Sequence, residues 1–76
     1  MLRPIEIMAY HDKNGNIKPL RIIENGKEYT CGEIIETSIN NYAGNTMRVF
    51  KLQKGHRTYD LFYELRTCKW FVKTEE

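Results

Sequence analysis

The fold class is clearest in one stretch, Arg57-Thr58-Tyr59-Asp60-Leu61-Phe62-Tyr63-Glu64-Leu65, of this chain of 76 residues. Large apolar residues occupy the odd-numbered positions from Tyr59 to Leu65, whereas the even-numbered positions are polar apart from Phe62. Successive side chains of a β-strand point to opposite faces of a sheet. A period of two therefore predicts a strand over residues 57–65 with one face in the core.

Comparable stretches lie on both sides of this strand. Runs rich in β-branched and aromatic residues are separated by short turns, and Asn25-Gly26 is the strongest hairpin signal among them. These runs predict strands over residues 3–11, 17–24, 27–37, 46–53, 57–65 and 68–74. Turns this short join antiparallel strands, because a parallel crossover needs a dozen residues or more. The expected topology is a meander of about six antiparallel strands.

The middle of the chain contains the least regular pattern. Gly32 interrupts the alternation within 27–37 and predicts a bulge or a sharp bend. A helical turn over residues 33–36 competes with the strand, since Ile35 and Ile39 lie four residues apart, but the density of β-branched residues favours the strand. Residues 38–45 hold three Asn and a Gly and predict the longest loop. Pro19, which has no N–H to donate, is expected near a strand start or on an edge strand.

The length of the chain limits it to one domain over residues 1–76. Five Tyr, three Phe and one Trp supply the large side chains that so small a core needs. A sheet without a covering helix buries its apolar side best by curling on itself. The sequence therefore predicts an all-β domain, a small SH3-like barrel or roll.

The composition sets limits on partners and location. Twelve basic and ten acidic residues give a formal charge of +2, which is too small to indicate nucleic-acid binding by itself. The charge is uneven, because residues 1–45 hold five basic and six acidic residues and residues 46–76 hold seven and four. No apolar run approaches the roughly 18 residues of a membrane span. We expect a cytoplasmic protein without a membrane partner.

The residues that usually carry catalysis or bind metal are few and scattered. His11 and His56 lie at turns, where a histidine is usually solvated. Cys31 and Cys68 are not part of closely spaced ligand pairs, so a zinc site made with the two histidines is disfavoured and both cysteines are expected to be reduced core residues. We therefore predict no enzyme, no metal site and no cofactor.

The turn at residues 12–16 has the Asp-x-Asn-x-Asn spacing that begins a calcium loop. The sixth position of such a loop requires Gly and the twelfth requires Glu, but Ile17 and Ile23 stand there. Asn and Gly are also the residues that tight turns prefer. A hairpin turn is the favoured interpretation.

The last three predicted strands place aromatic and basic residues on what we expect to be an outer face. If Tyr59, Leu61, Tyr63, Trp70 and Val72 fill the core, the outer candidates are Arg48, Phe50, Phe62, Lys69, Phe71 and Lys73. Three interpretations remain open: a contact surface for a protein partner or a second copy, a second small core covered by the N-terminal strand or the 38–45 loop, and a surface on which single-stranded nucleic acid stacks.

The first functional hypothesis is a non-catalytic interaction module that binds a protein partner or itself through Phe50, Phe62 and Phe71. The alternative is a nucleic-acid-binding barrel, in which Arg48, Lys69 and Lys73 contact phosphates and the same rings stack on bases. Asp60 and Glu64 oppose this alternative, since they lie beside Phe62 and repel phosphate.

Several short motifs carry a resemblance to known proteins: Ile5-Glu6-Ile7, Asn14-Gly15-Asn16-Ile17-Lys18-Pro19, Gly26-Lys27-Glu28-Tyr29, Tyr59-Asp60-Leu61-Phe62-Tyr63 and Trp70-Phe71-Val72. In this order they resemble small uncharacterised bacterial β-domains, in particular the short domain of unknown function that accompanies some Y-family DNA polymerases. The resemblance implies a small barrel and a link to DNA metabolism, and it supplies no active-site residues. The Asn-rich stretch 38–45 and the lack of a conspicuous basic cluster depart from that family.

Overall fold

The computed structural model describes residues 1–73 of the chain, so Thr74, the last residue of the predicted final strand, lies outside it. The described residues form a single sheet of seven strands and no helix. The strands are β1 (Leu2–His11), β2 (Ile17–Glu24), β3 (Lys27–Thr30), β4 (Glu33–Tyr42), β5 (Asn45–Lys54), β6 (Arg57–Glu64) and β7 (Lys69–Lys73). The predicted all-β class is confirmed. Among residues 1–73 there is no helix that is long and apolar enough to cross a membrane.

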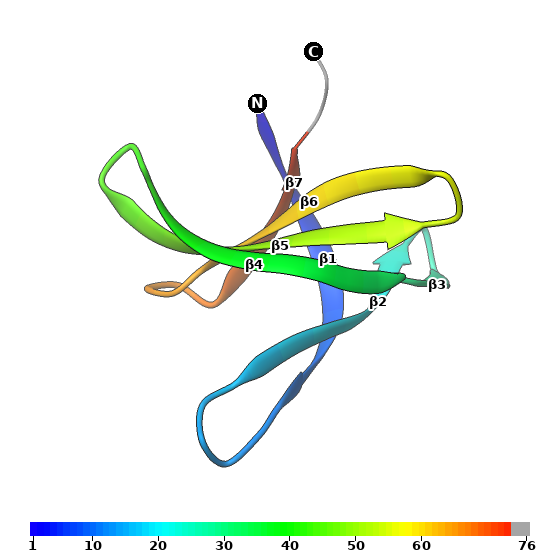
Figure 1. Ribbon diagram of the computed structural model, residues 1–76, viewed down its shortest axis with the longest axis horizontal. Coiled ribbons are helices and arrows are strands. Elements are labelled where there is room, and N and C mark those ends of the chain that lie inside the picture. Colours follow the sequence, from blue (N-terminus) through cyan, green and yellow to red (C-terminus); the bar gives the residue numbers. More distant parts are fainter. Residues whose placement is uncertain (74–76) are drawn as a thin grey trace.

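The sheet is curled into a half-barrel (Figure 1). Its strand order is β3-β2-β1-β7-β6-β5-β4, and every neighbouring pair is antiparallel. The first and last strands pair with each other, from Leu2 opposite Lys73 to Ile5 opposite Trp70. They form the centre of the sheet, and β3 and β4 form its two edges. The barrel or roll prediction is confirmed, while the specific likeness to SH3 barrels stays a prediction.

The segment predicted as one strand over residues 27–37 is two strands, β3 and β4, that lie at opposite edges of the sheet. Gly32 makes the sharp bend between them with a φ of 93°. A Cβ atom at this position would collide with the main-chain oxygen of Gln53, so the close approach also requires glycine. The bend at Gly32 is confirmed, and the alternative of a helical turn over residues 33–36 is wrong.

The Asn-rich stretch 38–45 is not the predicted loop. Strand β4 continues to Tyr42, and a tight turn of Ala43 (φ 50°) and Gly44 (φ 85°) leads into β5. Asn residues are tolerated there because β4 is an exposed edge strand, where their side chains remain in water. The loop prediction failed because Asn was interpreted by its turn preference alone.

Pro19 is the third residue of β2, so it lies near a strand start as predicted, and the pairing of β2 with β3 begins only at Arg21. The register of the β1–β2 ladder shifts between Met8 and Ala9, and Pro19 lies opposite Ala9 at this irregularity. A bulge interrupts the regular ladder, so a residue without an N–H is accommodated.

The concave side of the sheet holds the main hydrophobic core. Its buried members are Cys31, Phe50, Leu52, Leu61, Tyr63 and Trp70. The ring of Trp70 lies 4.7 Å from that of Tyr63 and 5.6 Å from that of Phe50, measured between centroids. Partly buried residues of β1 and β2, such as Ile5 and Ile22, pack on this cluster from the other half of the curl. The core therefore joins the two halves of the half-barrel.

Candidate ligand-binding site

Phe50 does not lie on the predicted outer face. It is opposite Leu61 in the β5–β6 ladder, and cross-strand partners share a face. Its side chain is 2% exposed and belongs to the concave core. Strand β5 has apolar residues on both sides, Met47 and Val49 on one and Phe50 and Leu52 on the other. Its alternation therefore cannot indicate which side faces the core, and the assignment of Phe50 was wrong.

Phe62 and Phe71 do share the convex face, where they are direct partners in the β6–β7 ladder. Phe62 is nevertheless only 2% exposed, because it packs with Met47 and Val49, and Leu2 and Phe71 border this group. The ring of Tyr42 stands edge-on to Phe62, with 5.3 Å between the centroids. Phe62 is thus part of a second small core covered by residues from the N-terminal strand and from 38–45, one of the three interpretations that the sequence left open.

The predicted basic residues are not gathered around these rings. Arg48 is opposite Tyr63 and shares the face of the concave core. Lys69 is opposite Glu64, and Lys73 is opposite Leu2, so both belong to the convex face. The predicted set of Arg48, Phe50, Phe62, Lys69, Phe71 and Lys73 is therefore divided between two faces and does not form one surface.

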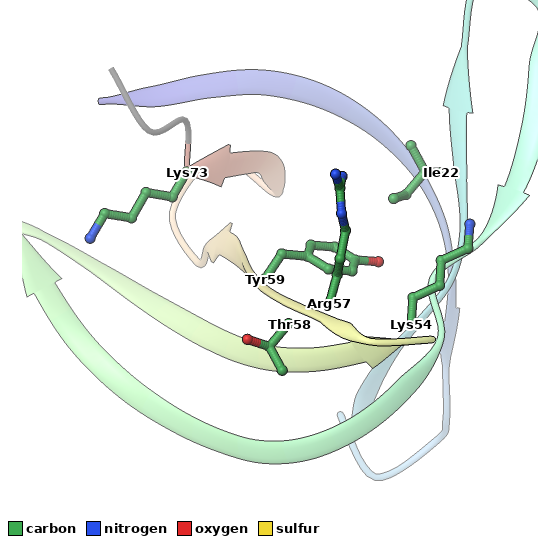
Figure 2. Close-up of a pocket in the computed structure, with 6 residues that line it drawn as sticks. All are labelled: Ile22, Lys54, Arg57, Thr58, Tyr59 and Lys73. Carbon is green, nitrogen blue, oxygen red and sulfur yellow. The ribbon is translucent and has the colours of Figure 1, made fainter.

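A different pair of basic residues, Lys54 and Arg57, lies at the end of the β5–β6 hairpin. A pocket of about 620 Å³ opens there, lined by Ile22, Lys54, Arg57, Thr58, Tyr59 and Lys73. Arg57 extends past the ring of Tyr59, Lys54 lies on the side of the Tyr59 hydroxyl, and Ile22 lies across from them, while Lys73 points away at the far rim (Figure 2). Of the residues that the structure describes, the lining includes three with cationic side chains and none with a carboxylate.

Lys54 and Arg57 are direct cross-strand partners on either side of the Gly55-His56 turn. Like charges in this arrangement repel and destabilise a hairpin. The ion pairs among residues 1–73 are Arg3–Glu24 at 3.6 Å and Arg21–Glu28 at 3.9 Å, and neither includes Lys54 or Arg57. Within the described part of the chain, the two positive charges at the mouth of the pocket are therefore not paired with a carboxylate. The sequence signal for this feature is the basic run Lys54-Gly55-His56-Arg57, which has no period-two alternation because it is a turn.

Two tyrosine rings adjoin these charges. The Nζ atom of Lys54 lies 5.6 Å from the ring centroid of Tyr29, a residue that is 44% exposed. The hydroxyl of Tyr59 donates a hydrogen bond to the main-chain oxygen of Cys31, and burial is the main cause that raises the pKa of Tyr59 to about 12. The Tyr59 hydroxyl is thus occupied by its hydrogen bond to Cys31 and stays protonated at neutral pH. Tyr59 can therefore contribute an aromatic ring to the pocket but cannot act as a general base there.

The remaining polar candidates have structural roles or lie apart. The Asp12 carboxylate accepts hydrogen bonds from the main-chain N–H groups of Asn14 and Asn16 and from the Asn16 amide, and these bonds hold its pKa below the ordinary value. Residues 12–16 therefore form a hairpin turn between β1 and β2, which is the interpretation favoured over a calcium loop. The His11 ring lies edge-on to Tyr63 at 6.4 Å.

The cysteines differ from each other. Both are free thiols, and Cys31 is buried as expected, whereas Cys68 is exposed in the turn before β7 with a φ of 60°. The core prediction for Cys68 failed because it assumed that the strand begins at residue 68. Within residues 1–73, no group of three or more His, Cys, Asp or Glu side chains is placed to hold a metal ion.

Comparison with known proteins finds no match to this chain among protein-family models, curated protein sequences or solved structures. The resemblance to the polymerase-associated domain stays a prediction.

Proposed function

We propose that this domain is a non-catalytic binding module for single-stranded nucleic acid, held at the end of the β5–β6 hairpin. The observation that carries the proposal is the Lys54–Arg57 pair, in which two like charges face each other and neither forms an ion pair with a carboxylate of residues 1–73. A phosphate bound between them would convert a destabilising pair into a favourable one.

The aromatic surroundings favour a nucleic acid over a simple anion. Proteins that bind single strands combine cationic side chains that contact phosphates with aromatic rings on which bases stack. The exposed ring of Tyr29 lies beside Lys54, and the ring of Tyr59 forms part of the pocket wall. The concave curl leaves room for a splayed base and excludes a duplex from the pocket, since the pocket holds only about 620 Å³.

This surface replaces the aromatic face on which both of our hypotheses were built. Phe50 and Phe62 are each 2% exposed, so neither ring offers a base or a partner protein a contact area without unfolding part of a core. Lys73 is the one predicted residue that the pocket retains. The link to DNA metabolism that the resemblance implies is compatible with this proposal.

The test is a titration of a labelled thymidine oligonucleotide, followed by fluorescence anisotropy, at about 50 and 200 mM salt. Two phosphate contacts predict that affinity falls about sevenfold over this range. The double variant Lys54→Gln/Arg57→Gln is expected to lose at least about tenfold in affinity, since both phosphate contacts disappear. A duplex of the same length is expected to bind more weakly.

A matched control removes the same charge elsewhere. Lys13 and Arg66 are exposed residues in the turns after β1 and β6, and neither lines the pocket. Lys13→Gln/Arg66→Gln should therefore bind almost as the parent chain does. Equal losses in the two double variants would mean that only net charge matters, and absence of binding in the parent chain at low salt would refute the proposal.

A further inference from the structure

The two edges of the sheet are built very differently. Strand β3 has four residues, and two of them, Lys27 and Glu28, are charged. Strand β4 has ten residues and contains no Lys, Arg or Pro, and its two charged residues, Glu33 and Glu36, both lie in its first four positions. Natural proteins shorten, charge or cover their edge strands because a free edge pairs with other chains. Edge β3 follows this rule, and no strand among residues 1–73 pairs with the outer side of β4.

The β4–β5 turn determines which main-chain groups of β4 are free. A hairpin with a turn of two residues closes on a pair that exchanges hydrogen bonds, here Tyr42 and Asn45, and the bonded pairs then recur at every second residue. Ser38 and Asn40 therefore bond to β5, whereas the N–H and C=O groups of Thr37, Ile39 and Asn41 point away from the sheet. The register runs without irregularity from Glu36 to Tyr42.

This regular stretch is self-complementary about Ile39. In an antiparallel pair of two copies centred there, Ile39 faces Ile39 of the second copy, Thr37 faces Asn41, and Glu36 faces Tyr42. The outward groups of Thr37, Ile39 and Asn41 would then exchange hydrogen bonds with the same groups of the second copy. Glu36 is the single charged residue of the stretch, and it meets a tyrosine and not a second carboxylate. Charge thus permits the pairing.

Two observations favour the register centred on Ile39 over the one centred on Thr37: the exposure of the Ile39 side chain and the bulge near the start of β4. Ile39 is 60% exposed, the most exposed large apolar side chain within any described strand. A register centred on Thr37 would bring Ile35 into the ladder, but the β4–β5 register shifts between Ile34 and Glu36, so this part of the strand is bulged. The register centred on Ile39 uses only the regular part.

We infer that β4 is a self-association edge, through which two copies of this chain join antiparallel about Ile39 into one continuous sheet. The symmetry is that of a two-fold isologous dimer. The occupant is a second copy because pairing about Ile39 covers this exposed side chain with its own counterpart and places Glu36 opposite no second carboxylate. The β5–β6 pocket does not include any residue of this stretch.

Sedimentation equilibrium from about 10 µM to 1 mM protein tests the inference. The parent chain is expected to pass from the mass of one chain to that of two. Ile39→Lys places two like charges opposite each other at the two-fold axis, so its dissociation constant should rise at least about tenfold. Tyr10→Lys is the matched control, because Tyr10 is 58% exposed on β1, and it should dimerise as the parent does.

A proline pair separates the dimer from the stability of one chain. Thr37→Pro removes an N–H that points outward, so it should abolish the dimer and leave unfolding of the monomer nearly unchanged, whereas Ser38→Pro removes an N–H bonded to β5 and should destabilise the fold. A parent chain that stays monomeric to 1 mM, or equal effects of Ile39→Lys and Tyr10→Lys, would overturn the inference. Oligonucleotide binding by Ile39→Lys should be unaltered at low protein concentration. The test of the dimer is therefore independent of the test of nucleic-acid binding at the pocket.

Discussion

The hydroxyl of Tyr59 on β6 is hydrogen-bonded to the main-chain oxygen of Cys31 in the bend between the two edge strands. This bond joins residues 28 positions apart and ties the bend to the centre of the concave core. Cys31 is fully buried, so its carbonyl has no access to water that could replace the tyrosine. The contact therefore helps to hold the half-barrel in its curl.

Replacement of Tyr59 by Phe should destabilise the domain. The variant leaves the buried carbonyl of Cys31 without a donor, which costs about 1–3 kcal/mol. Urea unfolding measures this loss, and Tyr10→Phe is the control, since Tyr10 is 58% exposed. Equal unfolding midpoints for the two variants would show that the bond contributes nothing to the free energy of unfolding.

The same tyrosine predicts a loss of stability in alkali. The pKa of Tyr59 rises from an ordinary value of 10.0 to about 12 in the folded state, mainly because the ring is buried. Between these values the unfolded chain releases a proton that the folded chain keeps, so this contribution is complete below pH 10 and is lost as the pH approaches 12. We expect unfolding free energies to fall more steeply from pH 10 to 12 in the parent chain than in Tyr59→Phe. Parallel curves would contradict this expectation.

Gly32→Ala should cost more stability than Gly15→Ala. The two glycines have similar positive φ angles, 93° and 87°, so the backbone strain of an L-residue is common to both. A Cβ at Gly15 meets nothing within 4 Å, whereas one at Gly32 collides with the main chain at Gln53. We expect a difference of about 1 kcal/mol or more in the free energy of unfolding, on the scale of other overpacking changes. Equal losses would mean that the bend relaxes freely.

The convex cluster should behave as a true core. Phe62→Leu in the convex cluster and Phe50→Leu in the concave core are each expected to destabilise the domain by about 1 kcal/mol, because each phenylalanine is 2% exposed. Thermal unfolding of the two variants provides the measurement. A stability of Phe62→Leu equal to that of the parent would indicate a loose convex cluster and would return Phe62 to the list of contact residues.

Thiol labelling should distinguish the two cysteines. Cys68 is exposed and should react quickly with an aromatic disulfide reagent at pH 8, whereas Cys31 is buried and its pKa is raised, chiefly by burial. One thiol per chain should therefore react in the native protein and two in urea. In Cys68→Ser no fast reaction should remain, and a fast phase in that variant would show that the core opens on the time scale of labelling.

The strand class of this chain could be predicted because period-two alternation depends on local sequence. The strand over residues 57–65 and the hairpin at Asn25-Gly26 were found in this way, and the structure has β6 and a two-residue turn there. The pairing of β1 with β7 joins distant residues, and no local pattern encodes it. The two edges and the curl of the sheet therefore became visible only in the structure.

The candidate site was harder to predict because both faces of the sheet are apolar in the centre. In β5 each face carries large apolar residues, so only the ladder register, Phe50 opposite Leu61, shows which face closes on the core. Lys54 and Arg57 lie where strands end and begin around a turn. In the sequence, such turn residues were used only to mark the boundaries between strands. Their opposition across the hairpin depends on the register of β5 against β6.

Only Cys31 and Gly32 separate the edge strands β3 and β4, so a connection of two residues joins one edge of the sheet to the other. The covalent length of this short tether limits how far the margins can separate at that end. A longer connection would allow the sheet to flatten and the β5–β6 pocket to widen while every strand kept its neighbours. The number of residues at this one bend is therefore a dimension along which related or engineered chains can change the volume of the pocket.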